Sequence, residues 1–189
     1  MVLFASQGAQ AFDLDALNAQ LRGQPVLRGD FVQEKHLRAL PQPLISRGQF
    51  VLAQEQGLLW QLRSPLQQDY RISASGIARR TAEGWQASAG QSASERQNRL
   101  ILALLSGDSE ALGADFNLQL DGTANAWQLN LTPRGALLGQ IFTRVQLRGG
   151  QHVEQIEIFE TQGDRTLMRL SALRSDTPLS DTERHDFLD

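Results

Sequence analysis

Two short runs of alternating hydrophobic and polar residues lie on either side of a polar turn in the segment 48–65. The apolar positions are two residues apart within each run: Phe50, Leu52, Leu58, Trp60 and Leu62. Successive side chains of a strand point to opposite faces, so the pattern predicts a hairpin with these side chains on one face. The tryptophan makes that face large and apolar.

The segment 115–133 repeats this pattern. Its apolar positions also alternate around a turn: Phe116, Leu118, Leu120, Trp127, Leu129 and Leu131. Strands are also predicted around Phe31, around Tyr70 and in a short segment at Trp85. Three more strands follow between residues 139 and 173, because tight-turn sequences at 148–150 and 162–164 divide that segment.

Helical spacing of apolar residues occurs in two places. Residues 13–22 place three leucines on one stripe, with Asp13 able to cap the start and Gly23 placed to end the helix. A mid-chain segment, 94–112, predicts two short helices, with Gly107 ending the first and Asp108 capping the second. The first of these has one apolar face: Leu100, Ile101, Leu104 and Leu105.

Many antiparallel strands and few helices predict a mainly β (α+β) fold. We expect one strongly curved antiparallel sheet, forming a half-open barrel, with the helices covering its concave side. The inward apolar residues then have two candidate partners, the helices themselves or a bound ligand. The sequence pattern alone does not choose between these partners.

The composition is that of an ordinary globular domain. The chain has 189 residues, 41% of them hydrophobic, and a formal net charge of -3 without a basic block, which argues against nucleic-acid binding. No apolar run approaches the ~18 residues of a membrane span, and there is no cysteine. We expect a single domain over residues 12–189 and no stable membrane insertion.

The N-terminal residues 1–11 have the character of a signal-peptide remnant. A short apolar run is followed by Ala9-Gln10-Ala11, which has the small-x-small form of a cleavage site. This interpretation predicts an exported protein, and the absence of cysteine suits the periplasm. The alternative is an ordinary apolar terminus.

Candidate catalytic groups are few. The three histidines, His36, His152 and His185, are not spaced as metal ligands and do not lie in a nucleophile motif. The acidic residues are scattered, and "ERHD" near the end of the chain has the pattern of a solvated charge cluster. We therefore expect no enzyme, no catalytic residue, no metal and no cofactor.

The order and spacing of several loose motifs resemble one known family. These motifs are "RGDFVQEK", "GQFVLA", "LLWQL", "AWQLNLTPR", "FTRVQLRGG" and "VEQIEIFETQGDRTLMRL". Together with the first helix and the mid-chain helix pair, they resemble the periplasmic lipoprotein carriers of the LolA family. The resemblance covers most of residues 13–173, and no single motif is diagnostic.

The resemblance implies a half-open sheet whose apolar interior holds the acyl chains of a lipoprotein or another acylated lipid. An inner-membrane exporter would deliver the cargo to a monomeric carrier, and an outer-membrane acceptor would receive it. The expected acyl-binding residues line the concave face: Phe50, Leu52, Leu58, Trp60, Leu62, Trp127 and Leu129. The expected lid helix carries Leu100, Ile101, Leu104 and Leu105.

The chain departs from the family pattern at two places. Where the carriers have an Arg-Pro pair that is important for handing cargo on, this chain has Gln54-Glu55. Its end, "DTPLSDTERHDFLD", is acidic where the carriers have an aromatic-rich segment. The alternative function is therefore a non-enzymatic sensor or protein-interaction domain of the same fold in the bacterial envelope.

Overall fold

The computed structural model describes residues 12–88, 93–175 and 177–188, with the backbone alone for 93–98. The strands are β1 (Val26–His36), β2 (Leu44–Ala53), β3 (Gly57–Ser64), β4 (Gln68–Ser73), β5 (Gly76–Thr81), β6 (Gly84–Ala87), β7 (Phe116–Thr123), β8 (Ala126–Pro133), β9 (Phe142–Gly149), β10 (Val153–Glu160) and β11 (Arg165–Arg174). The helices are α1 (Leu14–Arg22), α2 (Ala93–Ser106), α3 (Ser109–Asp115), α4 (Ala136–Gly139) and α5 (Asp181–Leu188).

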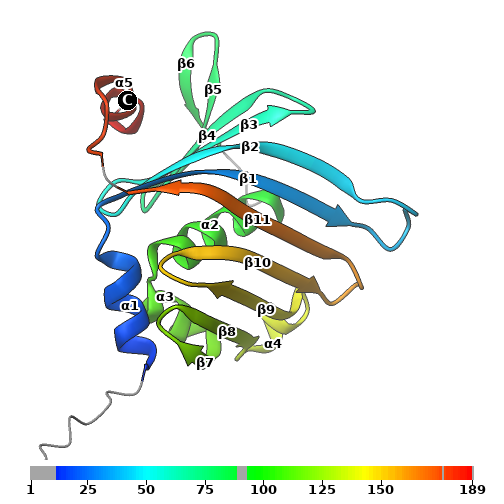
Figure 1. The fold of residues 1–189 in the computed structure, drawn as a ribbon. Coiled ribbons are helices and arrows are strands. Elements are labelled where there is room, and N and C mark those ends of the chain that lie inside the picture. Colours follow the sequence, from blue (N-terminus) through cyan, green and yellow to red (C-terminus); the bar gives the residue numbers. More distant parts are fainter. Residues whose placement is uncertain (1–11, 89–92, 176, 189) are drawn as a thin grey trace, which may run out of the picture.

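The strands form one antiparallel sheet in the order β6-β5-β4-β3-β2-β1-β11-β10-β9-β8-β7. The edge strands β6 and β7 do not pair with each other, so the sheet stays open. Figure 1 shows that it curves strongly around α2 and α3. About half of the described residues lie in strands. The predicted fold class, a half-open barrel with helices on its concave side, is confirmed.

The two apolar hairpins form in the predicted register. In the first, Phe50 lies opposite Trp60 and Leu52 lies opposite Leu58. In the second, Leu118 lies opposite Leu131 and Leu120 opposite Leu129. Directly paired residues of antiparallel strands share a face, so both hairpins present their apolar alternation to the concave side of the sheet.

Three helices cover the concave face, as predicted. The large core cluster joins Leu17 of α1, Leu104 of α2 and Leu112 of α3 to the apolar residues of the sheet. The predicted caps form at the starts of two of these helices: the carboxylate of Asp13 accepts from the Ala16 amide, and that of Asp108 accepts from the Ala111 amide. These helices can therefore bury one face on the sheet while their N-terminal amides are satisfied.

The short turn between α2 and α3 depends on Gly107. Its φ is +66°, in the left-handed region, as the predicted helix-ending position requires. A Cβ at this position would lie 2.8 Å from the Cβ of Leu21. The absence of a side chain therefore permits both the turn and the close approach of α1 to α2.

The last helix lies on the opposite side of the sheet, so the expectation that the helices cover one face is wrong for α5. A second apolar cluster joins Leu179 to Val51 and Leu59, which point away from the concave core, and Phe187 packs against it. Arg28 on the same face bonds to both carboxylate oxygens of Glu183, at 2.8 and 2.6 Å. The acidic tail is thus a docked helix rather than a solvated cluster. The predicted signal-peptide remnant, residues 1–11, lies outside the described residues.

Candidate functional site

The first hairpin contributes the centre of the apolar core. Trp60 is 4% exposed, and its ring stacks on Phe31 with the centroids 3.8 Å apart. Phe50, Leu52 and Leu58 are also buried there, and Leu62 is partly buried against them. The expected acyl-binding residues of this hairpin are therefore close-packed in the structure.

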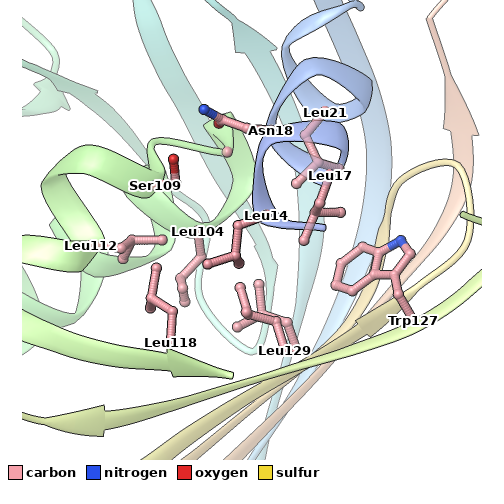
Figure 2. A pocket seen from close by; sticks show the side chains of 12 residues that line it. Leu14, Leu17, Asn18, Leu21, Leu104, Ser109, Leu112, Leu118, Trp127 and Leu129 are labelled. Atoms are coloured by element: carbon pink, nitrogen blue, oxygen red, sulfur yellow. The ribbon is translucent and has the colours of Figure 1, made fainter. Parts of the chain in front are cut away.

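A small cavity remains between α1, the α2–α3 turn and strands β7–β9. We call it the inner cavity. Its volume is about 20 Å³, enough for about one water molecule. Figure 2 shows Leu14 and Leu17 pointing from α1 toward Leu129 and the Trp127 ring. Both expected acyl-binding residues of the second hairpin, Trp127 and Leu129, thus lie on its wall.

Polar contacts hold α1 over the inner cavity. The indole nitrogen of Trp127 donates to the Gly150 carbonyl at 2.6 Å, and the Gln20 side chain donates to the same oxygen at 2.6 Å. In the same last turn of the helix, the Gln54 side chain donates to the Leu21 carbonyl at 3.1 Å. Gln54, which replaces the arginine of the family pattern, therefore binds the C-terminal end of α1.

A larger pocket of about 290 Å³ opens between α2, α3 and α4. We call it the surface pocket. Its wall is mainly apolar, and Arg99 and Asp115 contribute the charged groups. Its apolar lining residues are Leu100, Ala103, Ala111, Leu112, Phe116, Leu138 and Phe142. The volume is close to the lower end of the range found for small-molecule sites.

Leu112 separates the two spaces. It lines the inner cavity on one side and the surface pocket on the other. The structure also divides the expected lid residues between them: Leu104 lines the inner cavity and Leu100 the surface pocket, while Ile101 and Leu105 are buried in the core. Leu112 is therefore the residue that the walls of the two spaces share.

Some residues of the surface pocket were not expected from the sequence. Leu138 belongs to α4, a helix of four residues that periodicity cannot reveal. Phe142 begins β9, and its strand pattern showed only that it would be buried. The one available signal was the Leu137-Leu138 pair after Gly135, within a connection between two strands.

Fold and site together define a class of protein: a half-open antiparallel sheet with an apolar concave face under helices and an apolar pocket at its margin. The chain belongs to the LolA family. Residues 23–183 match the family model described as "Outer membrane lipoprotein carrier protein LolA". The predicted family resemblance is thereby confirmed.

Solved structures share the fold at low sequence identity. The LolA superfamily protein NE2245 from Nitrosomonas europaea is 10% identical, with a TM-score of 0.53 over 88% of this chain and 93% of that one. MucB in the MucA/MucB complex of Pseudomonas aeruginosa is 15% identical, with a TM-score of 0.52 over 89% of this chain and 58% of that one. At these identities the likeness concerns the fold alone.

No curated protein sequence is similar enough to this chain to count as a relative. Among the described helices, none has the length and apolar character needed to cross a membrane.

Proposed function

We propose that this protein is a periplasmic carrier of a Gram-negative bacterium. It binds the acyl chains of a lipoprotein, or of another acylated envelope lipid, and shuttles the lipid between the inner and outer membranes. The observation that carries this proposal is the apolar surface pocket between α2, α3 and α4. Membership of a family described as a lipoprotein carrier supports it. Acyl binding needs only apolar burial, worth about 0.8 kcal/mol per methylene, and requires no catalytic group.

The proposed route for an acyl chain begins at the surface pocket. Movement of Leu112 then admits the chain to the inner cavity, where Trp127 and Leu129 line the wall. Deeper binding displaces α1 and α2 from the sheet and uncovers the first hairpin. The full proposed acyl-binding set is Phe50, Leu52, Leu58, Trp60, Leu62, Trp127 and Leu129, with Leu100, Ile101, Leu104 and Leu105 on the lid.

The proposed partners follow from the same function. An inner-membrane exporter delivers the acylated lipid to the monomeric carrier, and an outer-membrane acceptor receives it. Since the cargo is recognised by apolar burial, its chain length and degree of saturation should matter more than any single polar contact.

A fluorescent fatty acid tests acyl binding directly. The wild-type protein should bind this probe at micromolar concentration, and phospholipid or lipopeptide should displace it. Ala111 is exposed and lines the surface pocket, so Ala111→Phe should fill the pocket without disturbing the core. We expect this variant to weaken probe binding on the order of tenfold, because filling the pocket removes the apolar surface that the probe would bury.

Ala114→Phe provides the matched control. Ala114 is exposed on the same helix but does not line the surface pocket. The control should bind the probe as the wild type does. Absence of probe binding by the wild type, or equal losses in both variants, would contradict the proposed site.

The close-packed concave face favours a second candidate function. With an inner cavity of only about 20 Å³, the protein could instead use its surface to bind a protein partner, as a non-enzymatic sensor or interaction domain of the envelope. MucB, which shares the fold, has been solved in complex with MucA. A protein that fails to bind acyl probes while it captures an envelope protein would support this alternative.

A further inference from the structure

Large exposed apolar side chains gather at one end of the sheet. We call this set the apolar rim: Leu40, Leu44, Ile45, Leu66 and Leu137. Leu44 is 53% exposed, Leu66 is 75% exposed and Leu137 is 79% exposed. In the described part of the chain, the one other large apolar side chain of comparable exposure is Leu188, on α5. Scattered exposed leucines need no explanation, but a cluster at one end does.

Pairing and hydrogen bonds place the parts of the apolar rim together. Arg47 of β2 pairs with Ser64 of β3, so the turn that carries Leu66 lies at the same end as the β1–β2 turn. The Arg38 amide donates to Asp164 at 2.8 Å, and the Thr161 hydroxyl donates to the Gly139 carbonyl at 2.8 Å. These bonds join the β1–β2 turn, the β10–β11 turn and α4, which Figure 1 shows at the right-hand end of the sheet.

Basic residues flank the apolar rim. Residues 35–47 contain Lys35, Arg38 and Arg47, and no aspartate or glutamate. Lys35 lies 3.8 Å from Glu160. Within the described ranges, neither Arg38 nor Arg47 takes part in an ion pair, and both are exposed. The hairpin end therefore presents leucines beside two exposed arginines without an ion pair, and, among the described residues, the one carboxylate bonded to this turn is that of Asp164, at the Arg38 amide.

This combination fits an anionic lipid surface better than a protein strand. Apolar side chains at the end of a hairpin can enter the interface between headgroups and acyl chains, and neighbouring arginines bind the anionic headgroups. A protein that added a β-strand here would need backbone hydrogen-bond donors from this turn. Pro41 and Pro43 in the turn have no amide hydrogen to donate.

We propose that the apolar rim docks this protein reversibly on an anionic lipid bilayer. Leu137 of the rim is next in sequence to Leu138, which lines the surface pocket. Docking therefore brings that pocket close to the membrane. The use of this position to exchange an acyl chain rests on the proposed carrier function, whereas the docking itself does not.

Vesicle flotation tests the docking. The wild type should bind vesicles of phosphatidylglycerol mixed with phosphatidylcholine, bind pure phosphatidylcholine weakly, and lose binding as salt is raised. Exchange of both Leu44 and Leu66 for serine should lower partitioning on the order of tenfold. The change of Arg38 and Arg47 to glutamine should lower it by about fivefold per arginine at low salt.

Matched controls come from other surfaces of the protein. Leu188→Ser removes an equally exposed leucine outside the rim, and Arg79→Gln removes an exposed arginine on β5. Both controls should bind vesicles as the wild type does. The proposal is overturned if the wild type does not bind anionic vesicles at millimolar lipid, or if the controls lose as much binding as the rim variants.

The same proteins, titrated with the fatty-acid probe without vesicles, separate the two proposals. Rim variants should retain probe binding, because none of the exchanged residues lines the surface pocket. A wild type that binds the probe but not the vesicles would overturn only the docking. A wild type that binds vesicles but not the probe would overturn only the carrier function.

Discussion

Trp60 lies on the concave face of the sheet, where a side chain can either pack in the core or line a binding site. Its place in the alternation directs it to the concave face, and there it stacks on Phe31 and lies 6.1 Å from the Phe50 ring. Close packing of this kind leaves no space for a ligand unless the helices move. In the structure as it stands, Trp60 contributes to stability through buried apolar area and aromatic contact.

Truncation of Trp60 should therefore be costly. We expect Trp60→Ala to lower the free energy of unfolding by about 3–5 kcal/mol, the usual loss for a large buried aromatic residue. Chemical denaturation measures this loss. Leu62→Ala, at a partly buried position of the same strand, is the control and should lose less. A Trp60→Ala protein that unfolds like the wild type but no longer binds acyl probe would instead place Trp60 on the wall of an open cavity.

At the scale of elements, α5 is the clearest addition to the predicted arrangement. Its contacts with the convex face combine the Leu179 and Phe187 packing with ionic bonds from Arg28 to Glu183 and from Arg80 to the buried Asp186. Trp85 packs on the same cluster, with the guanidinium groups of Arg71 and Arg80 each 5.2 Å from its ring centre. The helix is held by groups from β1, β2, β3, β4 and β5.

The docking of α5 should weaken at acid pH. The hydrogen bonds from Arg28 lower the pKa of Glu183 to about 2, from an ordinary value of 4.5. A lowered carboxyl pKa stabilises the folded form above the ordinary pKa, and this stabilisation is lost as the pH falls from about 4.5 toward 2. Its size is up to about 2 kcal/mol once partial exposure is allowed for.

Hydrogen exchange of residues 179–188 at about pH 6 and about pH 3 measures this effect. The wild type should lose protection of α5 at the lower pH. Glu183→Gln should have low protection at both pH values, and Asp181→Asn, at an exposed position of the same helix, should behave as the wild type does. A helix that keeps full protection in Glu183→Gln would show that the apolar contacts alone hold it.

For the whole molecule, one core links the sheet to the covering helices. The same cluster includes residues of α1, α2, α3 and strands from both halves of the sheet. A carrier with this core must exchange contacts between helix and sheet for contacts with the acyl chain. Under the proposed carrier function, the cost of displacing the helices would therefore weaken binding, and release of the cargo would restore the packed state.

Bound lipid should nevertheless raise the melting temperature. At a free ligand concentration of 100 times Kd, binding to the folded state alone stabilises it by about 2.7 kcal/mol. For a domain of this size, the melting temperature should rise by about 5–10 °C. Scanning calorimetry with a soluble lipopeptide measures the change, and a nonacylated peptide of the same sequence is the control. Equal melting temperatures with and without the acyl chain would argue against binding to the folded protein.

Much of the fold could be predicted because strand alternation and helix caps depend on residues that are close together in the sequence. Alternation in both hairpins determines which side chains share a face, and a one-residue slip would reverse all of them. Asp13 and Asp108 mark the starts of α1 and α3 because their carboxylates satisfy amides only three residues away. In contrast, α4 is too short to show a period, and the polar α5 has only a weak apolar face.

The sequence by itself determined the fold class, the apolar concave face and the family. What only the tertiary structure decided is which apolar residues remain accessible to a ligand. Alternation assigns a side chain to a face, but packing of distant segments determines whether it is covered: the first hairpin is buried in one core with residues of α1, α2 and α3, while α2, α3 and α4 leave the surface pocket open. The apolar rim likewise exists only because turns remote in sequence meet at one end of the curved sheet.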